Sequence, residues 1–171
     1  QSELGYVRNV SEDPNARGLL FAGTGAGLYY SIDERAGWTR LKTGLPPAPV
    51  TWTVVQPRFH DLVISTWGRG FYILDDISPL EQMAAERASG EVRLFTPRPT
   101  YQLLHRPSAL VNFELKAAPA GLVKIEILDA SGQVIRTLQR QAHAGLNRVA
   151  WDMRHEPLET VHLRTTPPEN P

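Results

Sequence analysis

The sequence predicts an all-β protein made of a partial β-propeller, a short linking helix and a partial β-sandwich. Short apolar or alternating runs are separated by clusters of proline, glycine and asparagine, two stretches of the first half repeat each other, and one stretch has helical periodicity. The predicted parts are propeller blades over 1–77, a helix and extended linker over 78–108, a sandwich over 109–157, and a linker or tail over 158–171.

The composition excludes several classes of protein. With 171 residues and 42% hydrophobic side chains, the chain can bury the cores of one or two small domains. The 18 basic and 18 acidic residues balance without a basic segment, so we expect no nucleic-acid partner. The absence of cysteine rules out disulfides and thiolate sites. No apolar run is long enough to span a membrane, and we expect any export signal to lie outside this chain.

An internal repeat joins residues 13–33 to residues 56–76. At a constant offset of about 43 residues, five pairs of residues match: Pro14 and Pro57, Leu19 and Leu62, Gly27 and Gly70, Tyr29 and Tyr72, and Asp33 and Asp76. Each copy contains three short strand-like runs, GYVRNV, LLFAGT and GLYYS in the first and TWTVVQ, LVIST and GFYIL in the second, and WTRLKT adds a fourth to the first copy. A period of roughly 40–45 residues with four short strands is typical of a propeller blade.

A different element follows at SPLEQMAAERAS, residues 78–89, which we expect to form a helix of about three turns. Ser78 can cap it, Pro79 suits its first position, and Glu81 completes a capping box. We interpret this helix as a connector in preference to a partner-binding element.

A second β pattern follows the extended, proline-broken stretch RLFTPRPTYQLLHRP. ALVNFELK alternates, GLVKIEILDASGQVIRTLQ indicates two strands joined by a turn at Asp129, and GLNRVAWDMR indicates one more strand. These strands predict part of an antiparallel sandwich.

Ser31, Asp33 and Trp38 resemble the Asp-box of bacterial neuraminidase-type (BNR) repeats, whose usual form is Ser-x-Asp-x-Gly-x-Thr-Trp. Arg35 replaces the usual glycine and Gly37 the usual threonine. The wider pattern, over about residues 5–81, resembles the closing blades of exported bacterial propellers of the sortilin-like and photosystem-assembly-like kinds, often labelled glycosyl hydrolases. Residues 109–154 resemble the immunoglobulin-like module of flagellar hook-capping proteins.

These resemblances imply an exported bacterial protein, located in the periplasm, outside the cell or on its surface. About two blades cannot close a propeller, so the resemblance also implies that the rest of a longer chain, or another protomer, completes the ring. In the second copy Asp76 holds the Asp-box position, but Leu74 replaces the serine and no tryptophan follows.

Asp33 is expected in the turn between the third and fourth strands, where its carboxylate can accept backbone N–H groups. Ser31 can add a local hydrogen bond, and the ring of Trp38 can pack between blades. This predicts a structural staple and not a catalytic acid. Asp33→Ala is then expected to lower the free energy of unfolding by about 1–3 kcal/mol, and unchanged urea denaturation would contradict the staple.

The turns over 24–27 and 67–70, between second and third strands, are expected on the ligand-binding face. Trp67 and Arg69 are the large side chains of these turns, and Trp52 enters an innermost strand nearby. A guanidinium beside indoles suits a carboxylate-bearing or sugar ligand, so these three residues form the predicted ligand site. In the alternative, Arg69 pairs with a neighbouring acid and the tryptophans pack between blades.

No catalytic set is predicted. A neuraminidase needs an arginine cluster, a tyrosine nucleophile supported by a glutamate, and an acid, whereas Tyr29 and Tyr30 share one strand with no glutamate near in sequence. Asp75 and Asp76 are neighbours in a predicted strand and so point to opposite faces. The histidines lack zinc-site spacing, and GTGAG lacks the lysine of a phosphate loop, so we expect neither a metal nor another cofactor.

The favoured function is that of a non-catalytic binding or scaffold segment that engages peptide, protein or glycan. The alternative is part of a sialidase-like glycoside hydrolase whose catalytic residues lie mostly outside this chain, which would place two acids or an arginine group near Arg69. In a third interpretation the sandwich is a secretion or surface-attachment module without a ligand.

Overall fold

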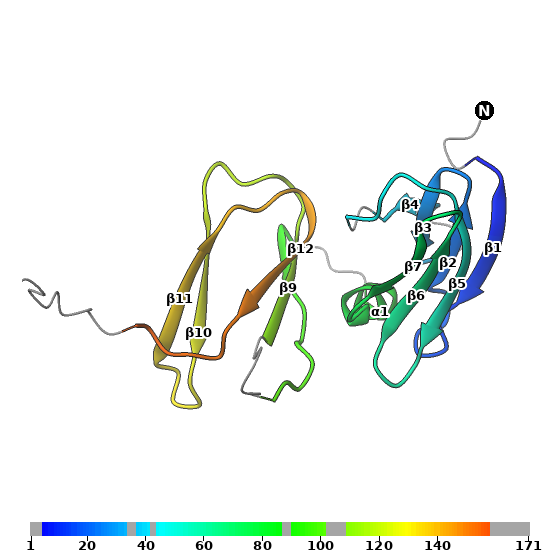
Figure 1. The fold of residues 1–171 in the computed structure, drawn as a ribbon. Coiled ribbons are helices and arrows are strands. Elements are labelled where there is room, and N and C mark those ends of the chain that lie inside the picture. The colour runs from blue at the N-terminus through cyan, green and yellow to red at the C-terminus, as the bar shows by residue number, and fades with distance from the viewer. Residues whose placement is uncertain (1–4, 34–36, 42–43, 87–89, 102–108, 158–171) are drawn as a thin grey trace, which may run out of the picture.

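The protein, seen in a computed structural model that describes residues 5–33, 37–41, 44–86, 90–101 and 109–157, is nearly all β with one short helix. Figure 1 shows two bodies, the first containing β1 to β7 and α1, the second containing β8 to β12. The elements in chain order are β1 (Val7–Glu12), β2 (Leu20–Thr24), β3 (Gly27–Ser31), β4 (Thr39–Arg40), β5 (Val50–Gln56), β6 (Asp61–Thr66), β7 (Gly70–Leu74), α1 (Ser78–Ala85), β8 (Val92–Leu94), β9 (Ala109–Leu115), β10 (Val123–Leu128), β11 (Val134–Arg140) and β12 (Gly145–Trp151).

The first body contains two antiparallel sheets whose strands follow chain order, β1-β2-β3-β4 and β5-β6-β7. The irregularity in the first pair of strands recurs in the second sheet: the register shifts between Val7 and Asn9 in β1, and between Val50 and Trp52 in β5. A bulge at the same place in both sheets shows that the sequence repeat is also a structural repeat.

The repeat is not a constant translation along the chain. Thr24 pairs with Gly27 across the first β2–β3 turn, whereas Thr66 pairs with Gly70 across the β6–β7 turn, which is therefore one residue longer. Counterparts lie 43 residues apart in β1 and β5 and in β3 and β7, but 42 apart in β2 and β6. The expected match of Leu19 with Leu62 is therefore wrong. The counterpart of Leu62 is Leu20, because the extra residue in the β6–β7 turn shortens the offset between β2 and β6 by one residue.

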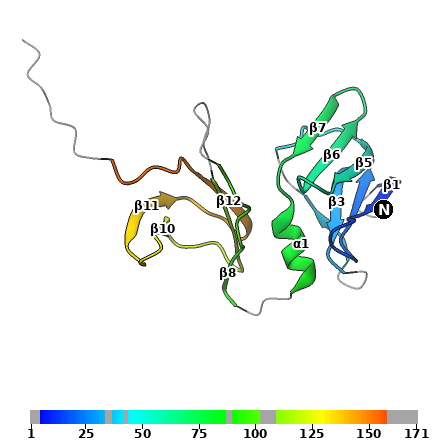
Figure 2. The same ribbon diagram turned by 90° about the horizontal axis from the view of Figure 1, so that it is seen from below.

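One face of each sheet packs on the other to form the main core. Phe21 of β2 and Ile64 of β6 are fully buried there, and the edge strands are linked because the Thr53 N–H donates to Asn9 Oδ1 at 2.9 Å. Helix α1 lies on the side of the first body that faces the second, as Figures 1 and 2 both show. The buried side chains of this core are Leu19, Phe21, Leu28, Val50, Val55, Leu62, Ile64, Ile77, Leu80, Met83 and Phe95.

The helix begins as predicted but is shorter and has no capping box. It spans Ser78–Ala85, and residues 87–89 of the predicted helix lie outside the described residues. The Ser78 hydroxyl donates to Asp76 Oδ1 at 2.6 Å instead of accepting an N–H of the first turn, and Glu81 contacts His60. The predicted capping box is therefore wrong, because the Ser78 hydroxyl bonds to the Asp76 carboxylate and the Glu81 carboxylate bonds to His60.

The second body has one strand more than the sequence indicated. Its sheets are β12-β9-β8 and β10-β11, and their core contains Phe113, Leu115, Leu138 and Val149. Strand β8 lies in the stretch predicted to be an extended linker over 78–108, because residues 92–94 pair with β9. The predicted β10–β11 turn is present: Asp129 Oδ1 accepts hydrogen bonds from Ser131, which lower the pKa of this carboxyl. The predicted tail over 158–171 lies outside the described residues.

Candidate ligand-binding site

The two turns predicted to face a ligand lie at the same end of the first body. Val7 at the start of β1 pairs with Thr24, and Val50 at the start of β5 pairs with Thr66, so both turns flank the beginnings of the edge strands. At this end Trp67 of the second copy lies close to Arg8 of β1.

The three predicted ligand residues are exposed. The side chain of Trp52 is 58% exposed and that of Trp67 68% exposed, so neither indole is packed between the two sheets. Arg69 is exposed and forms no ion pair with any residue that the structure describes. Within the described residues Arg69 is therefore not paired with an acid, and neither tryptophan packs between these two sheets.

The cation beside Trp67 is Arg8, which sequence reasoning missed. The Arg8 guanidinium carbon lies 5.6 Å from the centroid of the Trp67 ring and 4.8 Å from that of Tyr6. Arg8 also donates a hydrogen bond of 2.6 Å to the Tyr6 hydroxyl. Tyr6, Arg8 and Trp67 are called the aromatic–arginine group below. In a strand, residues two apart lie on the same face, so the spacing of Tyr6 and Arg8 is a signal that the sequence does carry. The contact of Trp67 with Arg8 depends on how the two sheets stack, and no local pattern indicates it.

The first turn fixes the position of Tyr6. The Gly25 N–H donates to the Tyr6 carbonyl oxygen at 3.0 Å, and a Cβ at Gly25 would lie 2.8 Å from the Tyr6 ring. Glycine is therefore required at this turn because the aromatic ring rests on its backbone. The Tyr6 ring is held in place before any ligand arrives.

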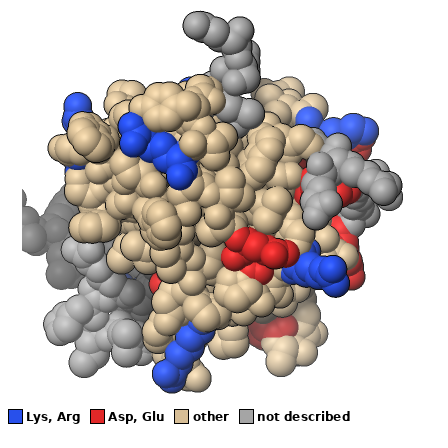
Figure 3. Space-filling model, turned by 90° about the vertical axis from the view of Figure 1, so that its right-hand side faces the viewer, with Lys and Arg blue, Asp and Glu red and all other residues tan. Residues whose placement is uncertain are grey.

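The side of the molecule that carries β1 is mostly uncharged (Figure 3). Figure 3 shows that the side of the molecule carrying β1 has few acidic or basic side chains, scattered over a mostly uncharged area. The second sheet also leaves one face uncovered, on which Trp52, Val54, Phe71 and Ile73 are between 48% and 79% exposed. An apolar sheet face of this kind indicates contact with another macromolecule.

The Asp-box residues lie at the opposite end of the first sheet. The buried Ser31 hydroxyl donates to the Asp33 carbonyl oxygen at 2.7 Å, which is the expected local bond. Asp33 is half-buried beside a shallow depression that Glu12 and Arg17 also line. Trp38 is 38% exposed before β4 and is not part of the main core, so the packing of its ring between blades stays a prediction. The staple role of the Asp33 carboxylate remains a prediction.

Asp76, the counterpart of Asp33, is buried where the two bodies meet. Strand β7 ends at Leu74, so the predicted placement of Asp75 and Asp76 within a strand is wrong. Asp76 is 5% exposed with a positive φ of 57°, and its N–H donates to Asp61 Oδ1 at 3.0 Å. Its carboxylate accepts the Ser78 hydroxyl and its backbone accepts Arg148, so this aspartate has a structural role.

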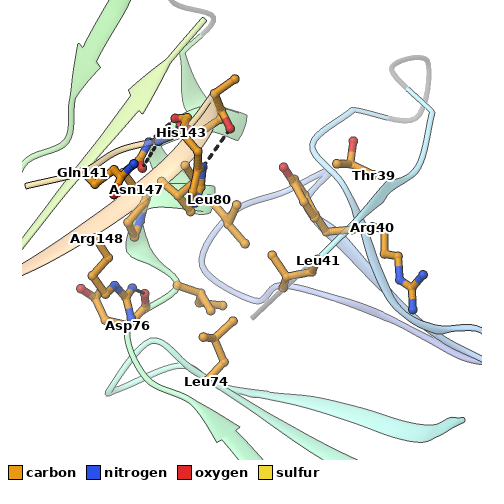
Figure 4. Close-up of a pocket in the computed structure, with 16 residues that line it drawn as sticks. Thr39, Arg40, Leu41, Leu74, Asp76, Leu80, Gln141, His143, Asn147 and Arg148 are labelled. Atoms are coloured by element: carbon orange, nitrogen blue, oxygen red, sulfur yellow. Dashed lines mark hydrogen bonds between the residues drawn. The ribbon is translucent and has the colours of Figure 1, made fainter. Parts of the chain in front are cut away.

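A cavity of about 830 Å³ separates the two bodies (Figure 4). Leucines of the first body form much of its wall, and Arg40 points away from it. On the opposite wall, the Asn147 side chain donates to the His143 carbonyl oxygen, and Arg148 donates to the Asp75 carbonyl oxygen at 2.7 Å. Burial, and secondly the charge of Glu114, raise the pKa of Tyr30 in this cavity. Of these groups, Arg148 links the two bodies, and the Asn147 bond lies within the second.

An acidic cluster lies at the end of the sheets opposite to Arg69. His60 Nδ1 donates to the Glu81 carboxylate at 2.7 Å, and Asn15 Nδ2 donates to Glu81 Oε1 at 3.3 Å. Asp13 is 2% exposed beside them, and burial, followed by the charge of Glu81, raises the pKa of its carboxyl. Asp13 Oδ2 has no hydrogen-bond partner among the described residues. The cluster therefore joins two loops to α1 and is remote from the ligand turns.

No family model, curated protein or solved structure matches the chain. Within the described ranges, no set of three or more histidine and acidic side chains could hold a metal ion, and no helix is long and apolar enough to cross a membrane. The candidate site thus consists of the rings of Tyr6 and Trp67 and the guanidinium of Arg8, which forms no ion pair with a described carboxylate. Such a group suits a carboxylate or the face of a sugar ring.

Proposed function

We propose that this chain is a non-catalytic binding and scaffold segment of an exported bacterial β-propeller protein, and that its aromatic–arginine group binds a carboxylate carried by a peptide, protein or glycan. The observation that supports this most directly is the position of Arg8, held between two aromatic rings at an exposed end of both sheets. A guanidinium held in this way is already ordered, so less side-chain entropy is lost when it binds an anion.

The propeller assignment is supported by the way in which the sheets stack. Phe21 lies on the face of the first sheet that packs on the second, and its counterpart in the second sheet is Val63. The face of the second sheet that packs on the first carries Ile64, and Val63 lies on the opposite face. The stacking is therefore head to tail, and repeating a head-to-tail contact with rotation generates a ring. A ring of four-stranded antiparallel sheets is a β-propeller.

The same stacking suggests what covers the open face of the second sheet. Trp52 and Phe71 on that face are the counterparts of Asn9 and Leu28, which contact the next sheet within this chain. In the proposed ring a further sheet, from the rest of a longer chain or from another protomer, would pack there. The second body, with its two small sheets around one core, would be the immunoglobulin-like module at the end of this propeller.

The ligand is testable by tryptophan fluorescence, because Trp67 is 68% exposed beside Arg8. The probes are sialyllactose with lactose as its neutral control, and a short peptide with a free terminal carboxylate with its amidated form. We expect saturable binding of the carboxylate probes and at least roughly tenfold weaker binding by Arg8→Gln, since charge-assisted bonds contribute on the order of 1.5–3 kcal/mol.

Arg58→Gln is the matched control. The Arg58 guanidinium also lies 5.6 Å from an aromatic centroid, that of Phe59, but in the β5–β6 turn at the other end of the sheet. Binding should be unchanged in this variant. If neither carboxylate probe binds, or if Arg8→Gln binds as well as the unchanged chain, the proposal is wrong. Release of sialic acid from sialyllactose would support the hydrolase alternative.

A further inference from the structure

The two sheets differ in their number of strands. In the first sheet β4 pairs with β3, with Tyr29 opposite Arg40 and Tyr30 opposite Thr39, and the Leu41 N–H donates to the Leu28 carbonyl oxygen at 2.9 Å. In the second sheet β7 is the counterpart of β3, and within the described ranges it pairs with β6 alone. Among the described residues, no strand therefore takes the position in the second sheet that β4 occupies in the first.

The repeat identifies which backbone groups face this open position. Phe71 and Ile73 are the counterparts of Leu28 and Tyr30. Because hydrogen bonds alternate along an antiparallel strand, residues 71 and 73 direct their N–H and C=O groups toward the open edge, and Tyr72 directs its groups toward β6. The edge of β7 thus offers main-chain donors and acceptors at the spacing that β4 uses in the first sheet.

The side chains along this edge are also uncovered. Phe71 is 79% and Ile73 62% exposed, whereas Leu28, the counterpart of Phe71, is 2% exposed. The strand GFYIL carries neither charge nor proline, although natural sheets protect exposed edges with such residues. An unprotected apolar edge is the feature to which a strand can add.

We propose that β7 takes up a fourth strand supplied by a partner, which runs antiparallel to β7 and pairs with residues 71–73. The occupant is an extended segment of at least three residues that resembles β4 and its flanks, with an apolar residue opposite Phe71, as Leu41 lies opposite Leu28. This inference goes beyond the proposed function, because it concerns a main-chain edge and not the aromatic–arginine group.

The probe is the peptide GWTRLKT, which has the sequence of residues 37–43, acetylated and amidated so that it carries no carboxylate. Hydrogen exchange of the full chain is followed amide by amide. Without peptide, the amides of Phe71 and Ile73 should exchange quickly and that of Tyr72 slowly. With saturating peptide, the amides of residues 71 and 73 should exchange roughly tenfold more slowly, because local opening of a paired strand costs free energy.

The matched control is the same peptide with proline in place of its first threonine, because Thr39 lies opposite Tyr30, the counterpart of Ile73, and proline has no N–H to donate to β7 there. It should give no protection, and Arg8→Gln should not alter the effect of GWTRLKT, which separates this test from that of the ligand site. Slow exchange at residues 71 and 73 in the free chain, equal protection by the proline peptide, or no protection by GWTRLKT would overturn the proposal. Protection that grows with protein concentration alone would assign the edge to a second copy and overturn it as well.

Discussion

Thr24 and Thr66 make the same hydrogen bond in the two sheets although their turns differ in length. The Thr24 hydroxyl donates to the Gly27 carbonyl oxygen at 3.0 Å, and the Thr66 hydroxyl donates to that of Gly70 at 2.9 Å. Thr24 is fully buried and its bond is partly buried, whereas the bond of Thr66 is exposed. The pair therefore provides a comparison of one interaction in two environments.

Thr24→Val should lower the free energy of unfolding more than Thr66→Val does. Thr24 Oγ1 also accepts the Ala26 N–H at 3.0 Å, so valine would leave a partly buried donor and a partly buried acceptor without this partner, at a cost of about 1–3 kcal/mol. At Thr66 water can replace the hydroxyl, and a loss of less than about 0.5 kcal/mol is expected. Urea denaturation of both variants measures the difference, and equal losses would contradict this account.

Phe95→Ala should destabilise the protein strongly although the residue lies in the stretch predicted to be a linker. Its ring is 2% exposed within the core of the first body. Truncation of a buried phenylalanine costs about 3–5 kcal/mol. Leu94→Ala is the control, because this neighbouring side chain is 70% exposed and its loss should change the free energy of unfolding little. A Phe95→Ala variant as stable as Leu94→Ala would show that the ring adds nothing to the core.

Arg148→Met should weaken the contact between the two bodies. Arg148 donates to the Asn112 side chain at 2.8 Å and to the Asp75 carbonyl oxygen at 2.7 Å. Its loss should lower the free energy of unfolding by about 1–2 kcal/mol, and lysine should not restore it because lysine lacks the planar fork. Arg140→Met, which loses only a bond to the adjacent Gln139 carbonyl, is the control. Full rescue by lysine would mean that charge alone matters.

Asp13→Asn should change how stability depends on pH. Burial raises the pKa of Asp13 above its ordinary value of 3.8. The folded state therefore binds this proton more tightly than the unfolded state, and the contribution of Asp13 to stability is largest below pH 3.8 and falls as pH rises toward the raised pKa. Asparagine cannot ionise, so the variant should gain stability relative to aspartate across this interval. Chemical denaturation at several pH values measures it, and a difference that shrinks with rising pH would have the wrong sign.

The strands of both bodies could largely be predicted because their signals are local. The alternation in residues 109–115 and the turn at Asp129 specify a strand and a hairpin without reference to the rest of the chain, and both are confirmed. Strand β8 could not be predicted, since three residues in an extended stretch form a strand only through pairing with β9.

The site was predictable in part. Trp67 and Trp52 were proposed as ligand residues because glycine-rich turns and strand starts are visible in the sequence, and Trp67 lies beside Arg8 in the proposed site. Arg8 was missed because it reaches Trp67 only after two sheets have stacked, and nothing local signals that approach. The capping box was predicted wrongly for a similar reason. The Ser78 hydroxyl donates to Asp76, whose backbone has a positive φ that the sequence pattern does not reveal.

Because Phe95 packs in the core of the first body and directly follows β8 of the second, no single cut of the chain separates the two bodies intact. A fragment ending at Ala85 would leave a hole where the aromatic ring belongs, whereas a fragment extended through Phe95 would take β8 away from β9. Recombination between proteins of this architecture would therefore have to move the two bodies together, or keep residues 90–95 with both.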